Sequence, residues 1–228
     1  IFQNKDDMED IKQISSLPLI DSVLIKGSGV SLKKFKNQPV DDEIPIILMA
    51  SRLLVDKGVL DFIEAARIIK KQAIPSRFVL VGDPDFDNPA SIDTNFLSNL
   101  NKNSDIEYWG HQEKMHEVLA ASTIVVLPSY REGLPKVLIE ASASSRAVIT
   151  TDVPGCRDAI IPGVTGLLVR PQDPVDLAHN IKVLLEDPLK RFNMGEAGRK
   201  MAEKVFDENI IISQHIKIYK DLLIQIDS

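Results

Sequence analysis

Two glutamates in the sequence have the setting that chemistry on a charged ligand requires. Glu132 stands in a polar loop after an apolar run, and Glu140 follows eight residues later. Pro135 suits the first position of a helix. The N–H groups from Lys136 onward would then lack partners within the helix and, together with the helix dipole, form an anion site. Glu140 would lie ~7.5 Å further along the helix axis.

A carboxylate beside an anion site repels phosphate but accepts strong hydrogen bonds from hydroxyl groups. A sugar nucleotide carries sugar hydroxyls, a diphosphate and ribose hydroxyls in that order. We therefore interpret Glu132 as a contact to a transferred sugar and Glu140 as a contact to a ribose. The alternatives are an ordinary loop glutamate and a solvated helix glutamate. The apolar neighbours Ile139 and Ala141 argue against a solvated Glu140.

Arg52 and Lys57 stand in a second segment, which links an apolar run to a helical pattern. The planar fork of arginine and the compact charge of lysine both suit phosphate oxygens. They could neutralise a leaving nucleoside diphosphate without a metal. The alternatives are that Arg52 pairs with a structural carboxylate and that Lys57 is solvated.

A third segment, residues 151–158, again follows an apolar run. Gly155 would allow the backbone to approach a ligand closely. Arg157 and Asp158 could bind a ligand or simply begin a helix. His111 follows Gly110 at the end of a predicted strand and could line a base pocket. The other histidines fall in helical patterns, and no cluster has the spacing of a metal site.

The hydrophobic pattern indicates strands that alternate with helices. We predict strands at 44–50, 78–81, 106–108, 123–127, 147–150 and 166–169. Helices are expected at 58–71, 95–103, 113–121, 135–144 and 175–185, then from 188 and from 207 to 225, with a further one at 5–15. This order predicts an α/β fold, a Rossmann-like doubly wound parallel sheet of about six strands with C-terminal helices. Ligands bind at the carboxyl ends of such strands, which directs attention to the loops 51–57, 82–89, 110–113, 129–135 and 151–158.

Composition limits the classes of function. The chain has 228 residues and a net charge of −6, which argues against nucleic acid as a partner. No apolar run reaches the ~18–20 residues that span a bilayer. Cys156 is the one cysteine, so no internal disulfide can form. The chain begins with Ile1 rather than Met, which favours a piece of a longer protein over processing or tag removal.

These motifs resemble those of the retaining glycosyltransferases of family 4, which have two Rossmann-like domains in the arrangement called GT-B. The family carries a Glu, seven residues and a second Glu, matched here by Glu132 and Glu140. The segments at 51–58, 80–83, 127–135, 150–158, 163–169 and 194–199 also match in order, so the resemblance covers about residues 23–224. The 154–158 and 82–89 stretches look most like bacterial enzymes that transfer N-acetylhexosamines or related sugars into lipid-linked oligosaccharides or polysaccharides. Ser145 and Ala147 depart from the family's Gly and Pro, which affects the end of a helix more than the chemistry.

The resemblance implies a role for each matching residue. Arg52 and Lys57 would bind the diphosphate, Glu132 would act as the catalytic contact to the donor sugar, and Glu140 would bind the ribose. The donor site would be completed by Gly82, His111 and the backbone around Gly133, Leu134, Lys136 and Val137. It also implies transfer with retention, through an oxocarbenium-like transition state, with no metal or other cofactor.

The resemblance further implies the organisation of the parent enzyme. Residues 1–43 would be the end of a missing N-terminal domain and a linker, 44–205 the nucleotide-sugar-binding domain, and 206–228 a helix that packs on the missing domain. That domain would bind the glycan or lipid-linked acceptor, so this chain alone would be inactive. A cytoplasmic location is expected, with peripheral association at the inner face of the membrane left open. A sugar-nucleotide epimerase and a non-catalytic binding module are the alternative functions.

Overall fold

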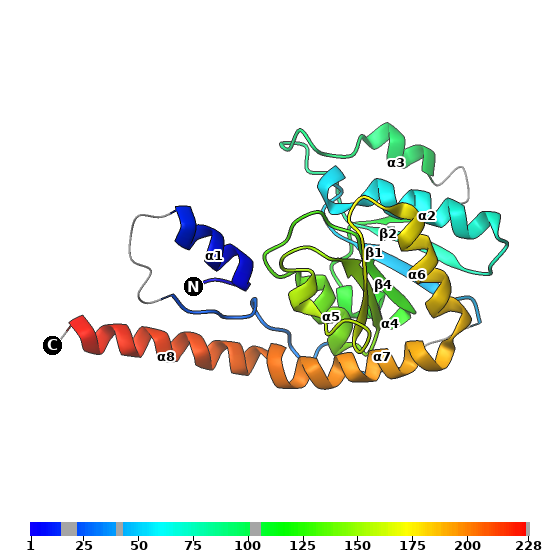
Figure 1. The fold of residues 1–228 in the computed structure, drawn as a ribbon. Helices are drawn as coiled ribbons and strands as arrows, with labels where there is room; N and C mark the ends of the chain where they lie inside the picture. The colour runs from blue at the N-terminus through cyan, green and yellow to red at the C-terminus, as the bar shows by residue number, and fades with distance from the viewer. Residues whose placement is uncertain (15–21, 40–42, 101–105, 227–228) are drawn as a thin grey trace.

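The core of the protein is a six-stranded parallel sheet, seen in a computed structural model that describes residues 1–14, 22–39, 43–100 and 106–226 (Figure 1). The strands are β1 (Ile46–Ala50), β2 (Arg77–Val81), β3 (Glu107–Gly110), β4 (Ile124–Leu127), β5 (Ala147–Thr151) and β6 (Gly166–Val169). Their order is β3-β2-β1-β4-β5-β6. The predicted doubly wound α/β sheet is therefore confirmed. Each strand start and end lies within two residues of its predicted position.

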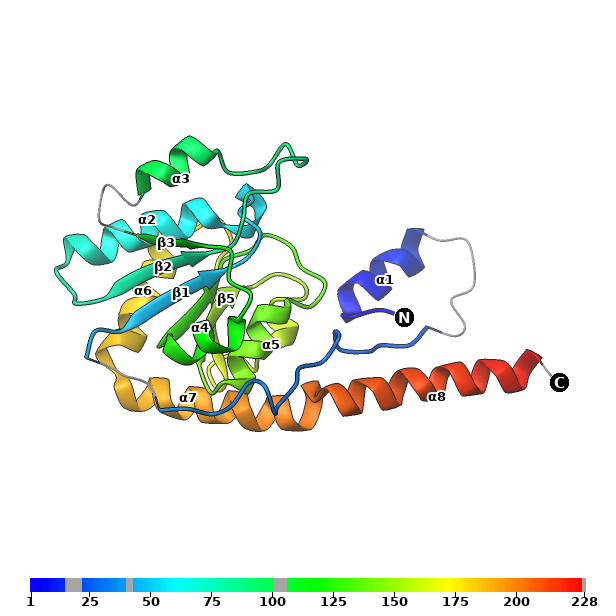
Figure 2. The same ribbon diagram turned by 180° about the vertical axis from the view of Figure 1, so that it is seen from behind.

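Both faces of the sheet are apolar because both are covered by helices. Along β1, Ile47 and Met49 enter one core, whereas Leu48 and Ala50 enter the other, as the alternation of a strand requires. The first face carries α2 (Val59–Lys71), α3 (Thr94–Leu100) and α6 (Pro174–Glu186). The opposite face carries α4 (Met115–Ala121) and α5 (Lys136–Ala143), which Figure 2 shows from behind. The expected 95–103 helix is confirmed only as far as Leu100, since 101–105 lie outside the described residues.

A long helical rod runs below the sheet and past its edge (Figure 1). It consists of α7 (Pro188–Met201), the π-helical turn η3 (Ala202–Phe206) and α8 (Glu208–Ile226). The far part of α8 projects away from the sheet and exposes large apolar side chains: Ile212, Ile216, Tyr219, Leu222, Leu223 and Ile224. The packing of this helix on a further domain stays a prediction. Within the described residues, no helix combines the length and the apolar character that crossing a bilayer demands.

The N-terminal segment lies apart from the sheet, next to the loop before α5. It begins with the helix α1 (Lys5–Ile14), close to the predicted 5–15. Phe2 forms a parallel bridge with Leu24, and Val30 forms another with Asp207, just before α8. Residues 22–39 therefore tie α1 to the helical rod and to the body of the domain.

Candidate functional site

Two loops at the carboxyl edge of the sheet are joined by their backbones. The loop after β1 ends in the short helix η1 (Val55–Lys57) and in Gly58, whose φ is +76°. A Cβ at Gly58 would overlap the carbonyl oxygen of Pro128 in the loop after β4, so only glycine allows this approach. The Tyr130 N–H donates to the Asp56 carbonyl at 2.8 Å. The two loops therefore hold a fixed position relative to each other.

This joint places Lys57 against Glu132. The Lys57 Nζ lies 2.7 Å from the Glu132 Oε1, and their side chains are 14% and 15% exposed. Lys57 is thus neither solvated nor isolated. The structure instead shows a largely buried ion pair formed by two residues that the sequence assigned to different parts of the ligand.

The end of β5 and the loop that follows it pack against the loop that carries Glu132. The Thr151 hydroxyl donates to the Ser129 carbonyl. Gly155, with φ +77°, leaves no room for a Cβ because the carbonyl oxygens of Glu132 and Gly133 lie against it. The loops after β1 and β5 thus fix the backbone on either side of Glu132.

A pocket of about 610 Å³ opens beside these loops. It is lined by Ala50, Ser51, Arg52, Val81, Gly82, Asp83, Pro84, Asp85, Phe86, Asp87, His111, Gln112, Met115, Lys136, Val137 and Glu140. A nucleotide-sized ligand fits this volume, which falls in the usual range for small-molecule sites. The pocket occupies the carboxyl edge of the sheet, as expected for an open parallel sheet.

The rim of the pocket places acidic side chains beside Arg52 and His111. Arg52, whose side chain is 63% exposed, has its Nη1 2.9 Å from the Asp85 Oδ2. The His111 Nδ1 lies 3.3 Å from the Asp83 Oδ2. Since the Arg52–Asp85 pair is exposed, it is weak. Arg52 can therefore leave the Asp85 carboxylate and bind another anion at little cost in free energy.

The first turn of α5 supplies open backbone donors to the same pocket. Pro135 precedes the helix with extended backbone, φ −71° and ψ 119°, so it takes the cap position rather than the first helical one. In the part of the chain that the structure describes, the N–H groups of Lys136 and Val137 donate to no protein acceptor. Open N–H groups at the start of a helix are suited to an anion.

Glu140 reaches the pocket from the second turn of α5. Its side chain is only 11% exposed, and its Oε1 lies 3.8 Å from the Lys136 Nζ. Burial raises the pKa of Glu140 above the usual range, although Lys136 and, further off, Lys34 act in the opposite direction. A buried carboxylate whose paired cation, Lys136, is exposed and 3.8 Å away is costly to the fold and suited to ligand hydroxyl groups.

We expect Glu140→Gln to increase stability at neutral pH. Because the folded-state pKa is raised, the native state holds this proton more tightly than the unfolded chain. Stability is therefore lost as pH rises from the ordinary range of glutamate through the folded-state pKa. We therefore compare the difference in free energy of unfolding, variant minus wild type, at two pH values. This difference should be larger at pH 7.5 than at pH 4, by more than the ~0.5 kcal/mol typical of a surface substitution.

Urea unfolding at the two pH values measures this change. Glu64→Gln serves as the matched control, because the Glu64 side chain is 43% exposed in an ion pair on the surface of α2. A variant-minus-wild-type difference for Glu140→Gln that is the same at both pH values would contradict the prediction.

The pocket gathers six of the ten residues assigned from sequence, namely Arg52, Gly82, His111, Lys136, Val137 and Glu140. Lys57, Glu132, Gly133 and Leu134 lie in the adjoining loops without lining it. The Leu134 side chain is buried and meets Gly27 of the N-terminal segment. Sequence reasoning missed the acidic loop at 83–87, although the 82–89 loop stood among those expected to bind. It also missed Asn4, whose only signal is its place just before the acidic first turn of α1.

Comparison with known proteins identifies the family of the chain. Residues 30–201 match the family model described as glycosyl transferases group 1. An N,N'-diacetylbacillosaminyl-diphospho-undecaprenol alpha-1,3-N-acetylgalactosaminyltransferase from Campylobacter jejuni is 34% identical, over 96% of this chain and 59% of its own.

Solved structures of this fold superimpose closely. Sucrose-phosphate synthase from Thermosynechococcus elongatus has a TM-score of 0.84 at 26% identity, covering 98% of this chain and 58% of its own. Anabaena HepE in complex with UDP has a TM-score of 0.82 at 19% identity, covering 96% and 63%, and so shares the fold.

The matched region is only part of each relative, since this chain spans about half to three fifths of the length of the curated relatives that it matches. The family model nevertheless covers most of this chain, from the end of its N-terminal segment through α7. The chain belongs to the group 1 glycosyl transferases, which adopt the GT-B fold.

Proposed function

We propose that this chain carries the donor site of a retaining glycosyltransferase and binds a UDP-sugar there. The observation that carries the proposal is a single pocket lined by Arg52, by the first turn of α5 and by Glu140. The cation and the open N–H groups suit a diphosphate, and the buried carboxylate suits the ribose hydroxyls. His111 would lie against the base, with Gly82 in the floor beneath it.

The Lys57–Glu132 pair fits the charges that such a transfer develops. The sugar carbon becomes positive while the leaving phosphate becomes negative, and the paired residues offer a carboxylate and a cation within 2.7 Å of each other. Glu132 would contact the sugar, and Lys57 would share the phosphate charge with Arg52. We propose that these groups act without a metal or another cofactor, and that the configuration at the sugar is retained.

The substrate class follows from the relatives. The Campylobacter enzyme is named for transfer of N-acetylgalactosamine to a lipid diphosphate sugar, and HepE has been solved with UDP. We propose a UDP-N-acetylhexosamine as donor and a lipid-linked glycan as acceptor. The acceptor would bind to a part of the protein outside this chain, so that transfer needs the longer protein, acting in the cytoplasm at the inner face of the membrane.

Calorimetry with UDP and UDP-sugars tests the donor site on this chain. We expect weak binding by the wild type and a loss of about tenfold or more in UDP affinity for Glu140→Ala, as for a missing charge-assisted hydrogen bond. Glu64→Ala on the surface of α2 is the control and should bind as the wild type does.

Two results would count against this proposal in different ways. Equal UDP binding by Glu140→Ala and the wild type would remove the ribose role of Glu140. A wild type that neither binds any UDP compound nor gains thermal stability from it would remove the donor site itself.

A further inference from the structure

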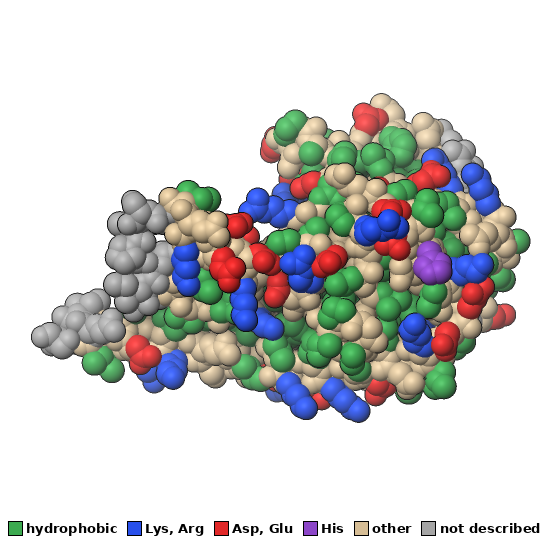
Figure 3. All heavy atoms as spheres, viewed as in Figure 1, with side chains coloured by type: hydrophobic (Ala, Val, Ile, Leu, Met, Phe, Trp, Pro, Cys, Tyr) green, Lys and Arg blue, Asp and Glu red, His purple; other side chains and the backbone are tan. Residues whose placement is uncertain are grey.

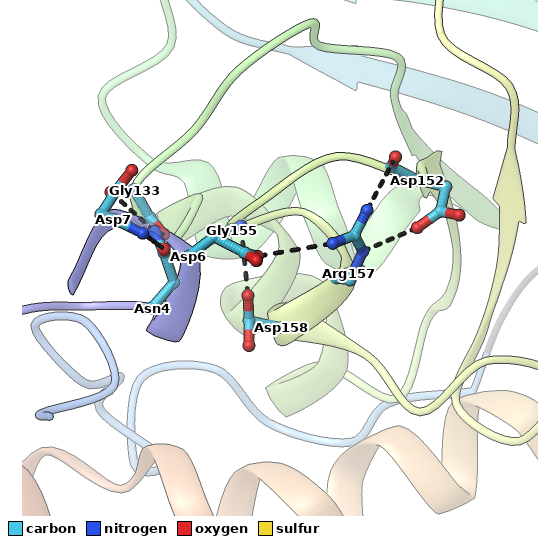
Figure 4. A network of polar contacts seen from close by, with 8 residues as sticks. All are labelled: Asn4, Asp6, Asp7, Gly133, Asp152, Gly155, Arg157 and Asp158. Atoms are coloured by element: carbon cyan, nitrogen blue, oxygen red, sulfur yellow. Dashed lines mark hydrogen bonds and ion pairs between the residues drawn. The ribbon is translucent and has the colours of Figure 1, made fainter. Parts of the chain in front are cut away.

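Asn4 is a fully buried polar side chain in a segment that otherwise lies outside the sheet. It is 0% exposed. Its Oδ1 accepts from the Asp7 N–H at 2.7 Å, so Asn4 caps the first turn of α1. Its Nδ2 donates to the Asp7 Oδ2 at 2.8 Å and to the Gly133 carbonyl at 2.8 Å. Figure 4 shows these bonds reaching from α1 to the loop after β4.

The chemistry of these contacts selects asparagine. One partner is a donor, the Asp7 N–H, and the other two are acceptors. A side-chain amide has one oxygen and two N–H groups, so it satisfies all three at once. Aspartate or serine could cap the helix, but neither could also donate to both remaining oxygens.

The bond to the Gly133 carbonyl fixes the peptide between Gly133 and Leu134. The peptide unit is planar and trans, so its carbonyl and its N–H point in opposite directions. With the Gly133 carbonyl held toward Asn4, the Leu134 N–H points away from α1. Among the residues that the structure describes, this N–H donates to no protein acceptor. This unpaired N–H, two residues after Glu132, needs an acceptor, which a ligand would supply.

Weaker contacts hold α1 in the same place. The Arg157 Nη1 lies 3.4 Å from the Asp6 Oδ2, and the Arg131 Nη2 lies 3.6 Å from the Asp7 Oδ1. Arg131 is 80% exposed and Arg157 is 42% exposed, so neither ion pair contributes much free energy. Figure 3 shows the acidic and basic side chains that gather where the N-terminal segment meets the domain. The buried amide of Asn4 is therefore the contact with the directional strength to orient the loop.

We propose that Asn4 is a positioning residue of the donor site: it orients the Gly133–Leu134 peptide so that the Leu134 N–H serves the sugar of the donor. This inference rests on the proposed function. Asn4 acts through the loop and touches no substrate. Through Asn4, the N-terminal segment takes part in donor recognition, in addition to any role as a linker.

The test compares UDP with UDP-sugars, because only the sugar would contact the peptide beside Glu132. Asn4→Ser and Asn4→Asp both keep an oxygen to cap α1 but cannot donate to Gly133 in the native way. We expect both variants to lose about tenfold in affinity for UDP-N-acetylgalactosamine or UDP-N-acetylglucosamine, whichever the wild type binds more tightly. Their affinity for UDP should change by less than twofold. Asn37→Ala is the control, since Asn37 forms an exposed bond to Glu196 on α7 and does not line the pocket.

The amide resonance of Leu134 in a ¹⁵N–¹H spectrum supplies a second readout that needs no ligand. It should shift in both Asn4 variants and stay in place in Asn37→Ala. Unchanged UDP-sugar affinity, an equal loss for UDP and UDP-sugar, or an unmoved Leu134 resonance would each overturn the role of Asn4. A wild type that binds no UDP compound, combined with a shifted resonance, would instead reject the donor site while keeping the contact.

Discussion

Gly155→Ala is expected to lower the free energy of unfolding by about 2–5 kcal/mol. Left-handed backbone costs an L-residue about 1–2 kcal/mol, and Gly155 has a φ of +77°. The new methyl group would also overlap the carbonyl oxygens of Glu132 and Gly133, and overpacking of this kind adds typically about 1–3 kcal/mol. Because the atoms in the way are backbone, relief requires one loop to move relative to the other. Urea unfolding of the variant measures the cost.

Gly163→Ala is the control that separates the cost of left-handed backbone from the cost of the steric overlap at Gly155. Gly163 has nearly the same φ, +75°, but a Cβ there would meet nothing within 4 Å. Its replacement should therefore cost only the conformational ~1–2 kcal/mol. If the two variants unfold at the same urea concentration, the contact between the loop after β5 and the loop after β4 does not contribute as described. Gly155→Ala should also weaken UDP-sugar binding, since the displaced backbone belongs to Glu132 and Gly133.

The fold could be predicted because its signals are local. Each buried strand is a short apolar run, and each helix has an apolar stripe, so the alternation of strands and helices follows from periodicity alone. Asp173 and Asp187 each precede a proline, and each caps a helix, accepting from the Asp176 and Lys190 N–H groups. Caps of this kind depend on residues within one turn and are therefore visible in the sequence.

The site could be predicted only in part, because its contacts join distant loops. The sequence placed Arg52 and Glu140 at the correct edge of the sheet, and both line the pocket. It could not show that Lys57 would pair with Glu132, which depends on the approach of Gly58 to Pro128. Which side of a loop a residue faces is decided by such tertiary contacts and not by its neighbours in the chain.

The role of Asn4 lay further beyond sequence reasoning. Asn4 and Gly133 are 129 positions apart, and the segment around Asn4 has the polar composition of a linker. Asp85 presents the same difficulty, since an acidic loop gives no indication of which cation it will meet. In both cases the sequence indicated a polar segment, and the fold supplied its partner.

Lys57→Met is expected to destabilise the protein by about 2–3 kcal/mol. Lys57 and Glu132 form their 2.7 Å pair with side chains only 14% and 15% exposed. Methionine keeps much of the lysine stem but leaves the Glu132 carboxylate largely buried and without its cation, which costs more than the loss of an exposed pair. Lys114→Met is the matched control, because Lys114 and Glu117 form a 3.1 Å pair whose side chains are 69% and 60% exposed. That control should change stability by less than about 1 kcal/mol.

The double variant Lys57→Met/Glu132→Gln identifies the cause. If the unpaired charge is what destabilises Lys57→Met, removing the carboxylate charge should recover part of the lost stability, and the two substitutions should not be additive. Thermal and urea unfolding of the wild type, Lys57→Met, Glu132→Gln and the double variant measure the coupling free energy between the two residues. Equal costs for Lys57→Met and Lys114→Met, or strict additivity in the cycle, would mean that the pair beside the pocket behaves as a surface contact. In that case Glu132 would be held by its loop alone, and Lys57 would be free to turn toward a phosphate without any cost to the fold.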